Sequence, residues 1–147
     1  METEQIFVGV GVIVEKDNKF LVVEEKSADL STDKVEGAYS FPGGHLLSGE
    51  SLESACEREV YEETKVKIKA EYIIGFFLVK GALGIGVKAE YLGEDLFKET
   101  EEIKKIRWMS AEEINNNKEK FRPGQLIGYM TYLKGGKFEL STVTTFL

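Results

Sequence analysis

The chain has 147 residues, a length typical of one domain, and its 26 acidic and 19 basic side chains give a formal net charge of −7. This negative charge repels nucleic-acid backbones, so we expect no nucleic-acid partner, and an anionic substrate would need divalent cations to bridge it to the protein. One Cys and one His exclude the usual zinc sites built from Cys and His ligands.

The sequence predicts neither a membrane-spanning segment nor a secretion signal. No apolar run approaches the length of a membrane span, and the N-terminus lacks the basic and apolar regions of a signal peptide. The lone Cys56 needs no oxidising compartment. We therefore expect no membrane association and a cytoplasmic location.

The first predicted element is a strand with one fully buried face, because apolar residues alternate without a break at Ile6, Val8, Val10, Val12 and Val14. The other face carries Gly9 and Gly11, which are small enough to let a helix or a ligand come close. Asp17 and Asn18 predict a turn into a second strand, Lys19–Glu25. The polar stretch 27–37 predicts a loop, and residues 39–41 predict a strand end before Pro42.

Carboxylates crowd one face of the next element, a helix with its N-cap at Ser51. Its apolar stripe comprises Leu52, Ala55, Cys56 and Val60. Glu59 and Glu63 fall inside that stripe, one turn apart, with Glu62 beside them, so the three repel one another and oppose the helix dipole. A merely solvated acidic face would lie opposite the stripe, where Glu57 lies.

The crowding therefore predicts a divalent cation. Oxygen ligands favour Mg²⁺ or Mn²⁺ over Ca²⁺, and magnesium usually shares its coordination between carboxylates, waters and the phosphates of a substrate.

The remaining elements are predicted as strands followed by helices. Residues 66–80 and 85–92 form a hairpin with Gly81 and Gly84 at its turn, and residues 106–109 form a short strand. Ser110 and Glu113 make a capping box for a short helix. Pro123 opens a last helix, ended by Gly135 and Gly136, whose apolar stripe is Leu126, Ile127, Met130 and Leu133. Residues 137–147 fit either an edge strand or a tail. This order predicts a mixed α/β layer structure.

Residues 44–66 closely resemble the signature box of the Nudix hydrolases. The matching positions are Gly44, Glu50, Arg58, Glu59, Val60, Glu62, Glu63 and Val66. One position departs, because Lys65 stands where the family has a Gly in the left-handed conformation that ends the helix. We expect this to cost about 1 kcal/mol without touching the carboxylates. The resemblance implies one Nudix domain over residues 1–147, with an α/β/α sandwich around a central mixed β-sheet.

The resemblance also assigns roles to residues. It implies Glu59 and Glu63 as principal metal ligands, with Glu62 joining them and the backbone carbonyl of Gly43 as a further ligand. Glu50 and Arg58 resemble the salt-bridged pair that orients the box loop, which Gly44 opens, and its helix. A later acidic ligand is best matched by Glu102, with Glu99 and Glu101 as competitors. Glu59 and Glu62 are the candidates for the general base, and the resemblance favours Glu59.

Substrate markers of particular Nudix branches are absent, which favours hydrolysis of a diphosphate bond in a nucleoside di- or triphosphate or a related nucleoside diphosphate derivative, by water attack on phosphorus. Three alternatives stay open: an ADP-ribose or nucleotide-sugar pyrophosphatase, a non-catalytic nucleotide-binding module, and a diphosphate isomerase that uses Cys56. Four aromatic residues could stack on a base or belong to the core, namely Phe7, Tyr39, Phe76 and Phe77. Family members are often homodimers, but no segment identifies a contact.

Overall fold

The structure is a computed structural model that describes residues 5–26, 37–79 and 81–145. Its strands form one sheet in the order β3 (Tyr39–Ser40), β2 (Lys19–Glu25), β1 (Phe7–Lys16), β6 (Ala82–Glu94) and β5 (Val66–Val79), while β4 (Gly43–His45) pairs with β1 and β7 (Ile103–Ser110) pairs with β2. β1 and β6 run parallel from the pair Phe7–Ala82 to the pair Glu15–Glu90, and the other ladders are antiparallel. The sheet is therefore mixed, as predicted.

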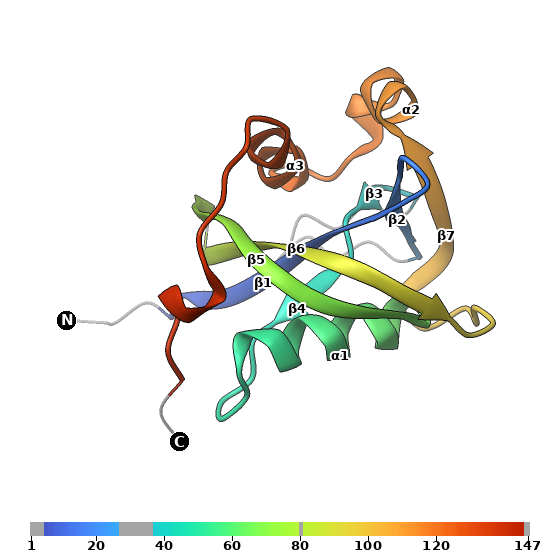
Figure 1. Ribbon diagram of the computed structural model, residues 1–147. Helices are drawn as coiled ribbons and strands as arrows, with labels where there is room; N and C mark the ends of the chain where they lie inside the picture. The colour runs from blue at the N-terminus through green and yellow to red at the C-terminus, as the bar shows by residue number, and fades with distance from the viewer. Residues whose placement is uncertain (1–4, 27–36, 80, 146–147) are drawn as a thin grey trace.

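Helices cover both faces of the sheet. α1 (Leu52–Thr64) lies on one face, and α2 (Ala111–Asn116) and α3 (Gln125–Leu133) lie on the other (Figure 1). Two short 3₁₀ helices, η1 (Lys118–Lys120) and η2 (Leu140–Thr142), lie in the connections that follow α2 and α3. Each face has its own core: Cys56 and Val60 of α1 belong to one, and Ile114 of α2 and Tyr129 of α3 to the other. This confirms the predicted α/β/α sandwich.

The first hairpin follows the prediction at its turn and departs from it at its start. Asp17 and Asn18 both take the left-handed conformation, with φ of 51° and 62°, and β2 has the predicted bounds. β1 begins only at Phe7, and Ile6 before it is 64% exposed, so the prediction that Ile6 lies on the buried face was wrong. Ile13 is buried on the opposite face, because α2 and α3 cover that side of the sheet.

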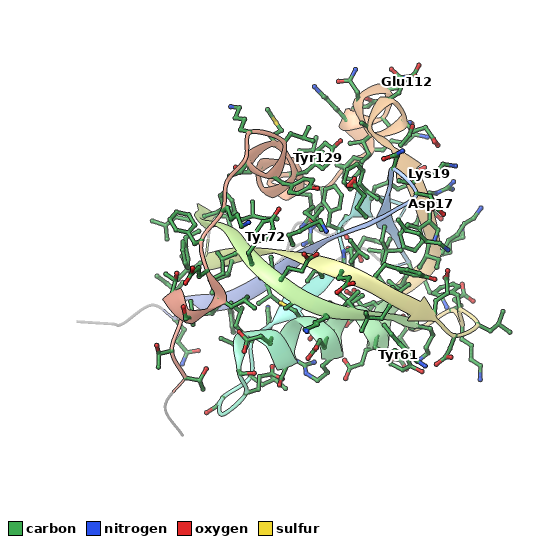
Figure 2. The ribbon with its side chains drawn as sticks, in the orientation of Figure 1. Asp17, Lys19, Tyr61, Tyr72, Glu112 and Tyr129 are labelled. Atoms are coloured by element: carbon green, nitrogen blue, oxygen red, sulfur yellow. The ribbon has the colours of Figure 1, made fainter. Side chains whose placement is uncertain are left out.

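The predicted apolar face of the last helix was right at Leu126, which packs against the core, and wrong at its other three residues. α3 begins at Gln125, after an N-cap at Gly124, and its fully buried residue is Tyr129. Figure 2 shows Tyr129 on the side of α3 that faces the sheet, where its ring packs against Phe20 and Phe41. Tyrosine rings thus occupy the core face of the helix, and the stripe residues Ile127, Met130 and Leu133 are exposed.

Strand ends differ from the prediction where pairing extends them. Gly81, with φ of 77°, lies in the turn of the β5–β6 hairpin, whereas Gly84 lies within β6 and pairs with Phe77. β7 begins at Ile103 because it pairs with almost the whole of β2. In the described part of the C-terminal segment, Phe138 forms a single bridge to Ile73 and no strand follows. The predicted loop 27–37 lies outside the described residues except for Gly37.

No helix in the described ranges is both long enough and apolar enough to traverse a lipid bilayer.

Candidate metal centre

Helix α1 sets the direction of the box carboxylates. Its N-cap is Ser51, whose hydroxyl accepts a hydrogen bond from the N–H of Ser54 at 3.1 Å, as predicted. Lys65 ends the helix in the left-handed conformation, with φ of 64°, and its N–H donates to the carbonyl of Tyr61. The predicted stripe is fully buried against the sheet. That burial fixes the rotation of the helix, so Glu59 and Glu63 face the β4 strand rather than open solvent.

Two glycines let the β4 backbone approach these carboxylates closely. A Cβ on Gly44 would lie 2.5 Å from the carboxylate of Glu59, and a Cβ on Gly43 would collide with the backbone of Val10. Neither position therefore has room for a side chain. The glycine pair is required by the contact between β4, β1 and α1.

Glu63 lies deepest in the site. Its Oε1 accepts a hydrogen bond from the N–H of Gly43 at 2.8 Å. Burial, reinforced by the nearby carboxylates of Glu59, Glu25 and Glu102, raises the pKa of Glu63 to about 8 despite that hydrogen bond. The assignment of the Gly43 carbonyl as a metal ligand stays a prediction, since the contact in the structure is made by its N–H.

Arg58 joins the box loop to the carboxylates of the helix. It binds both oxygens of Glu50, through Nη2 at 2.7 Å and Nε at 3.0 Å, which is the predicted salt bridge. Its Nη1 also donates to Oε1 of Glu59 at 2.7 Å and to Oε2 of Glu62 at 3.3 Å, and its Nη2 donates to the carbonyl of His45 at 3.2 Å. The pKa of Glu50 is lowered by Arg58, whereas burial raises the pKa of Glu59. Arg58 therefore holds three carboxylates in place.

The acidic cleft, as we call the hollow beside these residues, has a volume of about 330 Å³. It is lined by Glu59, Glu62, Glu63, Thr100, Glu101 and Glu102. The loop before β7 thus brings Glu101 and Glu102 opposite the helix, and the carboxylate of Glu102 is close enough to raise the pKa of both Glu59 and Glu63. Glu99, the third competitor, does not line the cleft and lies 3.5 Å from Lys26 in an ion pair.

The donor set of the acidic cleft fits a hard divalent cation. In residues 5–26, 37–79 and 81–145, no three His, Cys, Asp or Glu side chains are gathered tightly enough to form a metal cage by themselves. Magnesium does not require one, because it usually keeps several waters and takes one or two carboxylates. Burial first, and then the neighbouring carboxylates, raise the pKa of Glu63, and a cation bound in the cleft would oppose both effects. Glu59, Glu62, Glu63 and Glu102 are the residues that would hold it.

The aromatic candidates lie apart from the acidic cleft. Phe7 stacks on His45 with ring centroids 4.9 Å apart, and Phe76 lies against Phe138 at the surface. Phe77 is partly exposed, and its ring packs over Gly75 and Gly86 of the sheet. Tyr39 is buried and lines a different hollow. Of the residues described, these four do not line the acidic cleft, so their role in stacking stays a prediction without support from this geometry.

Cys56 is fully buried in the core beneath α1 and does not line the acidic cleft. Burial raises the pKa of its thiol to about 12. A reactive pocket thiol is therefore not present at this position, which removes the geometric basis for an isomerase that uses Cys56.

Two features of the site were missed from the sequence. The contact of Arg58 with Glu62 follows from helix spacing, since the two lie one turn apart, and could have been predicted, whereas the contact with the adjacent Glu59 could not. Thr100 could not, because its place in the cleft depends on the pairing of β7 with β2. Its Oγ1 accepts hydrogen bonds from the N–H groups of Glu102 and Ile103 and so shapes the loop that carries the distal acids.

A box helix of this geometry on a mixed sheet defines the Nudix class of domain. The model of the NUDIX domain family matches residues 6–129. The chain belongs to this family.

Known relatives and solved structures agree with this assignment. An ADP-ribose pyrophosphatase of Methanocaldococcus jannaschii is 36% identical over 70 residues, which cover 48% of this chain and 38% of the relative. Nudix hydrolase 2 of Arabidopsis thaliana is 31% identical over 137 residues, covering 88% and 48%. A NUDIX hydrolase structure from Nitrosomonas europaea superposes with a TM-score of 0.86 at 27% identity, covering 97% and 98%. The chain spans less than half the length of these curated relatives.

Proposed function

We propose that this protein is a divalent-metal-dependent pyrophosphohydrolase that cuts a phosphoanhydride bond in a nucleoside di- or triphosphate or a related nucleoside diphosphate derivative. The observation that carries the proposal is the convergence of the α1 carboxylates Glu59, Glu62 and Glu63 with Glu102 on one cleft. Such a cluster suits Mg²⁺ or Mn²⁺ clamped between protein carboxylates and substrate phosphates. We further infer that residues 1–147 form one Nudix domain and that it works in the cytoplasm, since its single buried thiol requires no oxidising environment.

The residues of the site have different roles in the proposed reaction. Glu59, Glu62, Glu63 and Glu102 would hold the metal, which when bound supplies charge neutralisation and an acidified water. Glu59 is the proposed acceptor of the proton of the attacking water, and its raised pKa brings it nearer the range of an effective base. Arg58 donates hydrogen bonds to both Glu59 and Glu50 and so fixes the box loop relative to the helix that carries the metal ligands.

The test is turnover of a substrate panel with Mg²⁺ or Mn²⁺. The panel contains nucleoside di- and triphosphates, ADP-ribose, nucleotide sugars and dinucleotide polyphosphates. We expect at least one compound to be cut, EDTA to abolish the reaction, and Glu63→Gln to lower kcat by orders of magnitude. Glu57→Gln, on the exposed face of the same helix, is the matched control and should turn over like the wild type. No cleavage across the whole panel would refute the proposal.

A second candidate substrate class is ADP-ribose and nucleotide sugars, favoured by the similarity to the relative named ADP-ribose pyrophosphatase. The products distinguish the classes. Pyrophosphate with a nucleoside monophosphate indicates a triphosphate substrate, whereas a sugar phosphate with a nucleoside monophosphate indicates a sugar-linked diphosphate. Tight nucleotide binding by calorimetry without any product would instead favour a non-catalytic binding module.

A further inference from the structure

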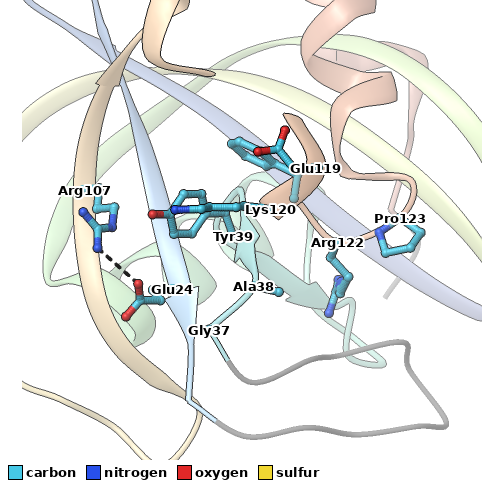
Figure 3. A pocket seen from close by; sticks show the side chains of 10 residues that line it. Glu24, Gly37, Ala38, Tyr39, Arg107, Glu119, Lys120, Arg122 and Pro123 are labelled. Atoms are coloured by element: carbon cyan, nitrogen blue, oxygen red, sulfur yellow. Dashed lines mark hydrogen bonds and ion pairs between the residues drawn. The ribbon is translucent and has the colours of Figure 1, made fainter. Parts of the chain in front are cut away.

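A second hollow, of about 520 Å³, lies where Glu24 of β2, Tyr39 of β3 and Arg107 of β7 meet η1 and the residues that follow it. Its charged and aromatic lining comprises Glu24, Tyr39, Arg107, Glu119, Lys120 and Arg122, and we call it the basic hollow. Figure 3 shows Arg107 and Arg122 entering from opposite sides, with Tyr39 between them. Three of these side chains are cationic and two are anionic, although the whole chain has a net charge of −7.

Arg107 is the most unusual residue of the basic hollow. Its guanidinium lies over the ring of Tyr39, 5.2 Å from the centroid, and its Nη2 donates to Oε1 of Glu24 at 3.1 Å. Its Nε is buried and finds no hydrogen-bond acceptor in the described part of the chain. The side chain as a whole is still 35% exposed, so part of the guanidinium remains open to solvent at the hollow.

Lys120 and Arg122 bring further positive charge to the same place. The ammonium of Lys120 lies 5.7 Å from the centroid of the Tyr39 ring, and the N–H of Arg122 donates to the carbonyl of Tyr39 at 2.8 Å. Phe121 between them stacks on Phe41, with centroids 5.4 Å apart. The segment that carries both cations is therefore anchored to β3, and the basic hollow keeps its shape without a ligand.

The basic hollow shares the end of β2 with the acidic cleft. Glu24 lines the hollow, and two residues later the N–H of Lys26 donates to the carbonyl of Glu102, which lines the cleft, at 2.7 Å. Arg122 also reaches the opposite face of β2, where its Nη1 lies 3.7 Å from Oε1 of the buried Glu25. A ligand in the hollow therefore lies next to the strand that supports the cleft.

We propose that the basic hollow binds a phosphate group, with Arg107 and Lys120 as its principal donors. The guanidinium of Arg107 and the ammonium of Lys120 both lie against the ring of Tyr39, and both are cationic donors that bind phosphate oxygens. Two sources share this chemistry: a phosphate of the substrate remote from the bond that is cut, or free inorganic phosphate. Only the first source depends on the proposed function.

Binding is tested by calorimetric titration of inorganic phosphate into the full chain in EDTA. We expect saturable binding to the wild type, weakened at least about tenfold in Arg107→Gln and in Lys120→Gln. Lys118→Gln is the matched control, because this exposed lysine belongs to the same segment and does not line the hollow. Absence of saturable binding, or equal weakening in all three variants, would overturn the proposal. Lys120 is exposed, so its variant remains informative if Arg107→Gln fails to fold.

The source of the phosphate is resolved by kinetics in phosphate-free buffer. If the substrate supplies it, Lys120→Gln raises KM and added phosphate competes with substrate in the wild type. If free phosphate supplies it, added phosphate changes the wild-type rate without competing with the substrate, and Lys120→Gln no longer responds to added phosphate. Phosphate binding that persists in Glu63→Gln, which lacks turnover, supports the hollow independently of the proposed hydrolysis. Loss of turnover on every substrate, with phosphate binding intact, would refute only the proposed hydrolysis.

Discussion

At the scale of single residues, the site combines charged groups that are individually unfavourable. Glu63 is a carboxylate in a poorly hydrated place, next to other acids, and its pKa is raised to about 8 because burial penalises its charge. Arg58 compensates Glu50 and Glu59 directly, whereas within residues 5–26, 37–79 and 81–145 Glu63 is hydrogen-bonded by the N–H of Gly43. Function and stability therefore make opposite demands on this side chain.

The first prediction concerns that conflict. In EDTA at neutral pH, Glu63→Gln should raise the free energy of unfolding, because it removes the cost of a desolvated carboxylate while keeping its shape. The same substitution should abolish turnover. Urea unfolding followed by fluorescence measures the change, with Glu57→Gln as the control at an exposed position of α1. A lower free energy of unfolding for Glu63→Gln would contradict this account.

The second prediction concerns Cys56, whose thiol pKa is raised to about 12 by burial. The unfolded thiol ionises near pH 9, so folding keeps it neutral and the folded state loses stability as the pH rises above 9. We expect a thiol reagent to label the native protein negligibly at pH 8 and completely in guanidinium chloride. Rapid labelling of the native protein would show that Cys56 is accessible. Cys56→Ser should retain turnover, since the thiol does not line the cleft.

At the scale of elements, α1 forms the part of the site that was predictable from sequence. The N-cap at Ser51, the apolar stripe and the left-handed Lys65 all follow from local rules of helix geometry. The ion pair of Glu50 with Arg58 followed from the resemblance to the box. The face of α3 was not predictable in this way, because long-range packing of Tyr129 on Phe20 and Phe41 decides it.

The third prediction tests the end of α1. Lys65→Gly should stabilise the protein by up to about 1 kcal/mol, because glycine adopts the left-handed conformation without strain. The gain is reduced by losing the contact of the Lys65 ammonium with the Tyr61 ring, 5.0 Å from its centroid. Chemical denaturation measures the difference. Lys67→Gly, in β5, is the control and should destabilise. Turnover should stay unchanged in Lys65→Gly.

The fourth prediction tests the approach of β4 to α1. Gly44→Ala should lower turnover strongly, because the added Cβ lies 2.5 Å from the Glu59 carboxylate and must displace it. Gly11→Ala, on the neighbouring β1, is the matched control, since a Cβ there has no atom within 4 Å. Equal activity of the two variants would show that the position of Glu59 is not fixed by Gly44. Steady-state kinetics with a substrate found in the panel provides the measurement.

At the scale of the whole molecule, an acidic chain concentrates several carboxylates in one cleft. The fifth prediction is that Mg²⁺ stabilises the folded protein, by about 2.7 kcal/mol at a hundredfold excess over its Kd, because it binds the folded site and not the unfolded chain. Thermal unfolding with increasing MgCl₂ measures this as a rise in Tm. NaCl of equal ionic strength is the control for screening. In Glu63→Gln the rise should be much smaller, and an equal rise there would place the ion elsewhere.

Some features of the whole molecule could be predicted from sequence and others could not. The layers of the sandwich were predictable because strand and helix periodicities are local and the box resemblance supplied their arrangement. The basic hollow was not predictable, because it depends on the register of the strand pairs. Glu24 of β2 pairs with Tyr39 on one side and with Lys105 on the other, and this register brings Arg107, from a distant part of the chain, to Glu24. Side chains that meet only through such pairing leave no local pattern.

The parallel ladder between β1 and β6 has a consequence for biosynthesis. Residue 7 pairs with residue 82, so the central strand leaves the ribosome long before its neighbour has been translated. Until then the edge of β1 that pairs with β6 has no partner strand, and the nascent chain must be kept from associating with others through it. Slowing translation ahead of residue 82 should therefore increase aggregation of the newly made polypeptide, whereas slowing it beyond residue 94 should matter far less.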